Sequence, residues 1–326
     1  MLVHIHIRPF EPNDQEYAAI GRIGYANFPG VHHFSAESSR EWDWQFQFAP
    51  HCKHQRFVAV HPETKQLVGY ASYSHEATAF HPQKFQIELL VDPAWQRHGI
   101  GTQLWNHLKN ELRKQNAILA RGETRQDKSA SLAFLHKLDF KETLQHWESH
   151  LDAEKFNFAP FYADTEKIKT LGIDITTLAK EGKSSREVRR KLYELHITVR
   201  RDVPQAEPYT AQDYELFEQR LIESPRVLDN GYFIAKKNGE YIGESTLFKV
   251  LDNPQRLSQG LTAVRREFRG QGIAMALKLE TIRYAQQQGY KIITTRNESN
   301  NIGMLAINQK LGFVREPTWI LFEKSL

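Results

Sequence analysis

Two short segments of this chain carry residue types that can bind an anion. One reads Gln-Arg-His-Gly-Ile-Gly over 96–101, and the other reads Arg-Gly-Gln-Gly-Ile-Ala over 269–274. If each segment begins a helix, its first N–H groups have no partner within the helix, and the helix dipole adds partial positive charge there. Glycine lets a ligand approach the backbone closely. Both segments therefore predict a site for phosphate or pyrophosphate, with a simple tight turn as the alternative for either one alone.

The two segments belong to a longer internal repeat. Val91–Gly101 matches Val264–Ala274, and Leu132–Phe140 matches Leu305–Phe313, in both cases at an offset of 173 residues. Two separate matches at one offset predict a duplicated domain, because chance similarity would not preserve the spacing. The length of 326 residues also suits two domains. The predicted domains are residues 1–155 and 156–326.

Alternation of apolar and polar residues predicts the strands that must position these segments. In the first half we expect strands at 56–60, 66–73, 85–91 and 117–120, and in the second half at 232–236, 240–248, 260–264 and 291–295. Leu104, Leu108 and Leu112 form an apolar stripe on the helix after the first segment. Hairpins beside strand–helix–strand connections predict an α/β fold class of the α+β type, in which each domain is a mixed, mostly antiparallel sheet flanked by helices.

The composition is that of an ordinary soluble protein, with 40% hydrophobic and 25% charged residues. No apolar run is long enough to cross a membrane, and the first residues lack the pattern of a signal peptide. The formal net charge of +4 suits a polyanionic ligand but is too small and dispersed to indicate nucleic-acid binding. Cys52 is the only cysteine, which excludes a disulfide within the chain and favours a reducing, cytoplasmic location.

Two further clusters have a structural and a functional interpretation. His146 and His150 have a spacing that suits a metal ion only on a helix, whereas this stretch is expected to be a strand, so we infer no metal site. The aromatic stretch Trp42–Phe48 is expected to pack on the first core, with an acceptor pocket for an apolar amine as the alternative.

Taken together, these motifs resemble the GNAT superfamily of acyl-CoA-dependent N-acyltransferases, and the tandem arrangement is similar to mycothiol synthase and other two-domain bacterial members. The residues that match the loop motif are Gln96, Gly99 and Gly101 in the first copy and Arg269, Gly272 and Ala274 in the second, and Asn308–Phe313 matches a later helix-to-strand segment. The resemblance covers most of both halves of the chain.

The resemblance implies acetyl-CoA as co-substrate, with its pyrophosphate on the two loops and its pantetheine arm along the strand ends. The implied contacts in the first domain are Val91, Gln96, Arg97, His98, Gly99, Ile100, Gly101 and Thr102. Those in the second domain are Val264, Arg269, Gly270, Gln271, Gly272, Ile273, Ala274, Asn297 and Asn301. An amine with an ordinary pKa must lose a proton before it attacks the thioester.

Glu88 and Glu244 are the candidate catalytic bases. The position of Glu88 matches that of a base in family members, with a salt bridge on the substrate side as the alternative. Glu244 is a substitute on the neighbouring strand, because the second domain has Leu261 at the matching position; its alternative is a solvated carboxylate. A tyrosine that protonates the leaving thiolate in many members is replaced by Leu135 and Asn308. The group that protonates the thiolate is therefore left open.

The two domains are not expected to be equal. The second has Asn297, Asn301 and Gly312, whereas the first has Asp139 in place of that glycine. We therefore predict that the second domain is catalytic and that the first binds cofactor weakly or shapes the substrate pocket. The expected function is transfer of an acetyl group from acetyl-CoA to an amine, most simply a small molecule, without metal, nucleic acid or membrane. A non-catalytic CoA-binding or sensing protein and a protein N-acetyltransferase are the alternatives, and the oligomeric state is open.

Overall fold

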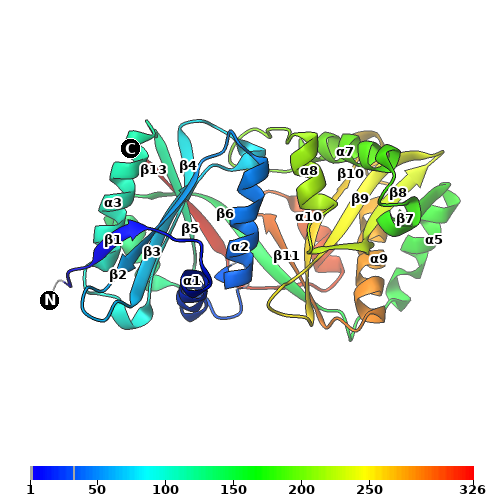
Figure 1. Cartoon of the computed structure of the whole chain (residues 1–326). Helices are drawn as coiled ribbons and strands as arrows, with labels where there is room; N and C mark the ends of the chain where they lie inside the picture. Colours follow the sequence, from blue (N-terminus) through cyan, green and yellow to red (C-terminus); the bar gives the residue numbers. More distant parts are fainter. Residues whose placement is uncertain (1–2, 32–33) are drawn as a thin grey trace. The chain divides into compact units, whose positions relative to one another are not determined.

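The computed structural model describes residues 3–31 and 34–326. The chain divides into two compact units (Figure 1). Unit 1 consists of Met1–Leu144 and Ile320–Leu326, and unit 2 consists of Gln145–Trp319. The predicted linear division after residue 155 follows the sequence repeat and stays a prediction. The compact units depart from a linear division because the last strand of the chain belongs to unit 1.

Unit 1 is a mixed sheet in the order β1-β2-β3-β4-β5-β13, with β1 to β4 antiparallel and β4 parallel to β5. Its strands are β1 (His6–Pro9), β2 (His54–Val60), β3 (Leu67–Ser74), β4 (Lys84–Val91), β5 (Leu119–Arg125) and β13 (Trp319–Ser325). Its helices are α1 (Asp14–Asn27), α2 (Ala36–Gln45), α3 (Ile100–Lys114) and α4 (Ser129–Lys137), with single 3₁₀ turns η2 (Phe46–Phe48), η3 (Ala77–Ala79) and η4 (Pro93–Trp95).

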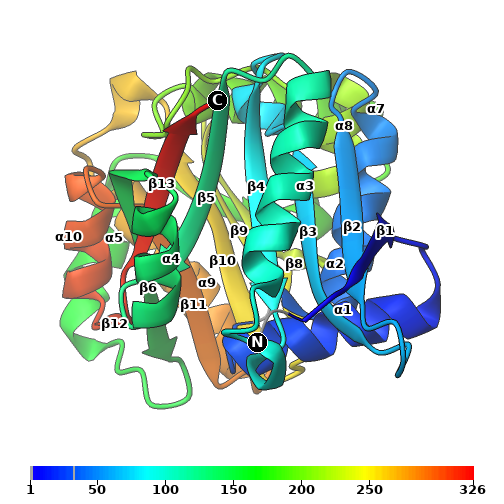
Figure 2. The same cartoon turned by 90° about the vertical axis from the view of Figure 1, so that its left-hand side faces the viewer.

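Helices cover both faces of the unit 1 sheet. Along β2, Phe57 and Ala59 pack with the α3 core, whereas Val58 between them packs with α1, because side chains alternate between the faces of a strand. The predicted stripe of Leu104, Leu108 and Leu112 is fully buried. Figure 2 shows α3 and α4 on the same face of the sheet.

Unit 2 repeats this plan in the order β6-β11-β10-β9-β8-β7, with β12 also paired to β6 and β10 parallel to β11. Its strands are β6 (Lys141–Asp152), β7 (Ile173–Thr177), β8 (Val227–Lys237), β9 (Glu240–Lys249), β10 (Arg256–Val264), β11 (Ile292–Glu298) and β12 (Val314–Arg315). Its helices are α5 (Tyr162–Thr170), α6 (Leu178–Glu181), α7 (Arg186–Arg200), α8 (Tyr214–Leu221), α9 (Ile273–Gln287) and α10 (Ile302–Lys310), with 3₁₀ turns η5 (Ala159–Phe161) and η6 (Arg266–Phe268).

The two faces of the unit 2 sheet also have separate cores. Tyr232 and Ile234 of β8 pack with α7 and α8, and Phe233 and Ala235 pack with α5 and α9. The predicted fold class, a mixed α/β sheet flanked by helices and present twice, is confirmed.

The strands at the ends of the two repeats are exchanged between the units. β6 follows the last helix of the first repeat but pairs with β11 in unit 2, where Leu151 lies opposite Ile293. β13 follows the last helix of the second repeat but lies beside β5 in unit 1, where Ile320 and Phe322 join the core around Leu104. Neither sheet is therefore complete without a strand from the other sequence repeat.

Candidate active site

Both predicted anion-binding segments have the same backbone conformation at the start of a helix. Arg97 (φ 67°) and Gly99 (φ 80°) precede α3, and Gly270 (φ 74°) and Gly272 (φ 91°) precede α9. All four lie in the left-handed region, which glycine adopts without steric cost. Neither helix has a side chain that caps its first turn, so the first N–H groups are left for a ligand. The arrangement fits an anion such as pyrophosphate.

The remaining loop residues differ in how far they are exposed. Buried residues are Val91, Ile100, Val264 and Ile273; half-buried residues are His98, Gly101, Gln271 and Ala274; exposed residues are Thr102 and Arg269. A Cβ placed on Gly101 would lie 3.4 Å from the Phe134 ring. The first loop thus lies directly against an aromatic side chain of α4. The phosphate contacts predicted for these residues stay predictions.

The first side chain of each segment holds the end of the preceding strand. Gln96 Nε2 donates to the carbonyl of Val91 at 3.1 Å, and Arg269 Nε donates to the carbonyl of Val264 at 2.9 Å. The Arg269 guanidinium also lies 2.5 Å from an oxygen of Asp202. Hydrogen bonds from Arg266 and Arg269 lower the pKa of the Asp202 carboxyl to about 2. These side chains shape the loops, and the prediction that Arg269 also contacts phosphate stays open to test.

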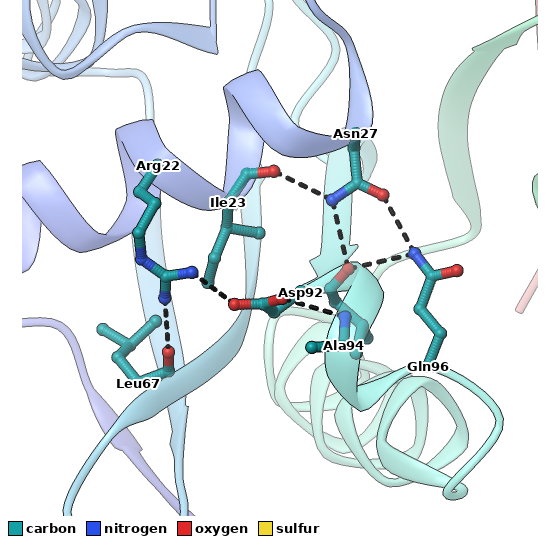
Figure 3. A network of polar contacts seen from close by, with 8 residues as sticks. Arg22, Ile23, Asn27, Leu67, Asp92, Ala94 and Gln96 are labelled. Atoms are coloured by element: carbon teal, nitrogen blue, oxygen red, sulfur yellow. Dashed lines mark hydrogen bonds and ion pairs between the residues drawn. The ribbon is translucent and has the colours of Figure 1, made fainter.

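In unit 1 the same strand end is tied to α1 (Figure 3). Asn27 Nδ2 donates to the Val91 carbonyl at 3.1 Å, and Gln96 Nε2 donates to Asn27 Oδ1 at 3.0 Å. Arg22 forms an ion pair with Asp92 and donates to the Leu67 carbonyl at 3.1 Å. The first loop is therefore fixed from two sides.

The two parallel strands of each unit separate on the side of the loop. β4 and β5 are paired from Lys84 to Gln86, although β4 continues to Val91. β10 and β11 are paired from Arg256 to Ser258, although β10 continues to Val264. The unpaired half of each strand leads directly to an anion-binding loop. An extended molecule bound through its pyrophosphate can lie along that half, as predicted for the pantetheine arm.

Unit 2 has a β-bulge in this half-strand. Gln259 pairs with Leu247 and Thr262 pairs with Ser245, so Gly260 and Leu261 together oppose Thr246. In unit 1 the register between β3 and β4 is regular. Matching residues of the two units are 172 apart before the bulge and 173 apart after it, which marks an insertion of one residue. A bulge leaves backbone groups out of the ladder, and bulges are frequent beside active sites.

A chain of buried hydrogen bonds supports the bulge from α9. Gln259 Nε2 donates to the Thr246 carbonyl at 2.9 Å and to Ser245 Oγ at 3.1 Å. Thr281 of α9 donates to Gln259 Oε1 at 3.0 Å, and Thr262 Oγ1 lies 2.7 Å from Ser245 Oγ. Gln259 thereby provides a hydrogen bond to the carbonyl of Thr246, the residue opposite the bulge.

The corresponding residues of unit 1 are all apolar. Gly69 and Gly243 occupy matching places, since each faces its strand end and a leucine of the next helix. The strand pairing and these two glycines align the two units. Ala71 matches Ser245, Ile87 matches Gln259, Leu89 matches Thr262, and Leu108 matches Thr281. The polar support is therefore a property of unit 2.

The two predicted bases lie in different environments. Glu88 of β4 is half-buried and accepts a hydrogen bond of 2.9 Å from Tyr70. Burial raises the pKa of Glu88, against the opposing effect of nearby Arg56. Glu244 of β9 is 0% exposed and is bound by His196 and Tyr232. Glu244 is therefore no solvated carboxylate, and its role as base stays a prediction.

The asparagines of unit 2 lie at the end of β11 and on α10. Asn308 is buried, and its Nδ2 donates to Asn297 Oδ1 at 2.7 Å. Asn301 caps α10 by accepting from the Met304 N–H at 3.4 Å. Thr124 and Leu135 occupy the positions of Asn297 and Asn308 in unit 1. The predicted contacts of Asn297 and Asn301 with the cofactor are proposals that these positions permit.

The aromatic stretch of unit 1 lines a cavity of about 410 Å³. Trp44 and Gln47 line this cavity together with Arg56, whose guanidinium is paired with Asp43 at 2.8 Å. Guanidinium and histidine contacts lower the pKa of Asp43 against its burial. The stretch thus combines packing with a polar pocket wall.

Sequence reasoning missed His196 and the bulge. His196 lies on the buried stripe of α7 with Leu192, Leu195 and Val199, and a histidine within an apolar stripe is a signal that the helical periodicity carries. Gly260 inside a strand pattern is a signal for a bulge.

Neither a metal cluster nor a membrane span occurs in the described part of the chain. Residues 3–31 and 34–326 contain no group of three or more His, Cys, Asp or Glu side chains placed to hold a metal ion. Among the same residues, no helix is long and apolar enough to cross a membrane.

Comparison with known proteins places this geometry in context. A model of the Acetyltransferase (GNAT) family matches residues 19–140 and 190–313. A mycothiol acetyltransferase of Amycolatopsis mediterranei is 25% identical over 262 residues, which are 78% of this chain and 79% of the relative.

Two solved structures share the fold of the whole chain. A tandem GNAT protein from the clavulanic acid biosynthesis pathway has a TM-score of 0.74 at 20% identity, with 99% of this chain and 98% of that chain covered. A GCN5-related N-acetyltransferase from Sphaerobacter thermophilus has a TM-score of 0.69 at 16% identity, with 98% and 95% covered.

Proposed function

Because the chain belongs to the GNAT acetyltransferase family, whose model matches both repeats, we propose that it transfers an acetyl group from acetyl-CoA to the amino group of a small molecule. The relative described as a mycothiol acetyltransferase supports a small-molecule acceptor. The acceptor amine loses a proton and attacks the thioester carbonyl. The new C–N bond forms, the C–S bond breaks, and CoA leaves as the thiolate.

We further propose that unit 2 is the catalytic unit. The observation that carries this proposal is the bulge at Gly260 and Leu261 with its buried support. An attacked carbonyl develops negative charge on oxygen, and preorganised backbone N–H groups stabilise that charge. The bulge takes Gly260 and Leu261 out of the regular pairing of the half-strand that leads to the α9 loop, and their backbone N–H groups would serve this task. The first N–H groups of α9 would hold the pyrophosphate of acetyl-CoA.

Unit 1 has the same loop but a regular β4. We propose that it binds CoA weakly or shapes the acceptor pocket. Its cavity beside Asp43 and Arg56 supports a role in holding a polar ligand. Cys52, the one cysteine of the sequence, is buried and suits the reducing, cytoplasmic location that we infer.

The test is incubation of the purified protein with acetyl-CoA and a panel of amines and peptides, followed by measurement of free thiol. Turnover that depends on a small amine supports the proposal, and turnover on peptides alone favours a protein N-acetyltransferase. Binding of acetyl-CoA in calorimetry without turnover on any acceptor contradicts an enzymatic function and favours a CoA-binding protein.

A further inference from the structure

Glu244 cannot contact a substrate directly. Its side chain is enclosed, with 0% of the residue exposed. One carboxylate oxygen lies 2.9 Å from His196 Nδ1, and the other accepts a hydrogen bond from the Tyr232 hydroxyl. Glu244 stands opposite Ala263 in the β9–β10 ladder, close to the bulge. A proton from an acceptor can reach this carboxylate only through a neighbouring group.

His196 is the neighbour that can carry the proton. It lies on α7, which packs over Leu261 and Ala263 of β10 through its apolar stripe. Its Nδ1 faces Glu244. The second ring nitrogen, Nε2, has no hydrogen-bond partner among residues 3–31 and 34–326. The His196 ring packs against the Phe217 ring, with 5.5 Å between the two ring centroids.

We propose that His196 is the catalytic base of unit 2 and that Glu244 is its positioning residue; this assignment rests on the proposed function. A carboxylate bound to Nδ1–H fixes the tautomer that leaves Nε2 basic, and it stabilises the imidazolium after proton transfer. The acceptor reacts as the neutral amine, after its ammonium proton has passed to solvent, and Nε2 takes one further proton from it as the C–N bond forms and the C–S bond breaks. The proton then passes to the CoA thiolate, which leaves as the thiol, so that His196 returns to its neutral form.

The matching positions in unit 1 do not reproduce this pair. By strand pairing and the matching glycines Gly69 and Gly243, Tyr70 of unit 1 corresponds to Glu244 of unit 2, and Arg56 corresponds to Tyr232. Unit 1 instead pairs Tyr70 with Glu88. The histidine–carboxylate pair therefore occurs in the same unit as the bulge.

Two substitutions and a matched control test the assignment. His196→Gln removes the base, and Glu244→Gln keeps the shape of the positioning side chain but removes its charge. His75→Gln is the control, because His75 is also a buried histidine, 2% exposed, whose Nδ1 accepts a backbone hydrogen bond at 2.9 Å. Each variant is measured with the most active amine of the panel, and its affinity for acetyl-CoA is measured by calorimetry.

We expect His196→Gln to lower kcat by about 10²–10⁴-fold, the usual contribution of a general base. Glu244→Gln should lower kcat by about 10-fold or more, since the tautomer is no longer fixed. Both should keep the affinity for acetyl-CoA, and His75→Gln should keep kcat. A merely structural pair would alter stability but leave the kcat of the folded protein unchanged.

The failures are distinguishable. Full kcat in a folded His196→Gln variant overturns the assignment of His196 and leaves the proposed function intact. If His196→Gln does not fold, full kcat in Glu244→Gln overturns the assignment instead. Absence of turnover by the wild-type protein on every acceptor overturns the proposed function and the assignment with it.

Discussion

The buried support of the bulge can be removed by one substitution, Gln259→Met. Methionine keeps the length of the side chain, so the change leaves little cavity. It removes the three hydrogen bonds to Ser245, to the Thr246 carbonyl and to Thr281. At about 1 kcal/mol for each bond, the loss of stability should be about 3 kcal/mol.

The same substitution should reduce catalysis beyond its effect on stability. Without Gln259 the Thr246 carbonyl loses its partner, and the bulge is free to shift. A displacement of about 1 Å at a reacting group can cost about 10²-fold in rate. The assay is urea denaturation followed by kcat with acetyl-CoA and an active amine, under conditions where the variant is folded.

Gln286→Met is the matched control for this experiment. Gln286 also lies on α9, and its amide donates to the carbonyls of Ala153, Glu154 and Phe156, away from the bulge. It should lose stability but keep kcat. Equal kcat values for wild type and Gln259→Met would refute the reasoning that the bulge acts in catalysis.

Two further predictions concern the cores of the units. Burial lowers the pKa of Lys278 to about 7, so above that pH the unfolded chain binds more protons than the folded one, and stability should rise with pH up to about pH 10, the ordinary pKa of lysine. Urea denaturation from neutral to alkaline pH measures the free energy of unfolding, and Lys278→Met should remove its rise with pH. An unchanged slope of that free energy against pH would show that another group causes the rise. Phe322→Ala, at a position 0% exposed in unit 1, should cost about 3–5 kcal/mol and accelerate amide hydrogen exchange in β2 to β5. Unchanged exchange there would contradict the place of β13 in unit 1.

Local patterns were sufficient to predict the strands β2 to β5 and β8 to β11 and the start of the helix after each loop. The repeat located both loops, and Leu104, Leu108 and Leu112 located the buried face of α3, because a helix start and an apolar stripe depend on neighbouring residues. The exchange of β6 and β13 was not predictable in this way. Alternation indicates that a segment is a strand, but the choice of its partner strand depends on long-range packing.

The site was predictable only in part, for a similar reason. The bulge is a single inserted residue just before the Val264–Ala274 motif, and its effect on register is seen only when β9 lies beside β10. Glu244 was identified as a candidate, but its partner His196 is 48 residues away in sequence. A contact between a helix and a strand so distant has no signal in local periodicity.

The most direct test of the central claim compares Arg269→Glu with Gln96→Glu. Each substitution places a carboxylate at the first position of one loop, beside the carbonyl of Val264 or Val91. If unit 2 holds the reacting acetyl-CoA, Arg269→Glu abolishes acetyl transfer and Gln96→Glu retains it. Loss of activity in Gln96→Glu with activity retained in Arg269→Glu would contradict the assignment of catalysis to unit 2.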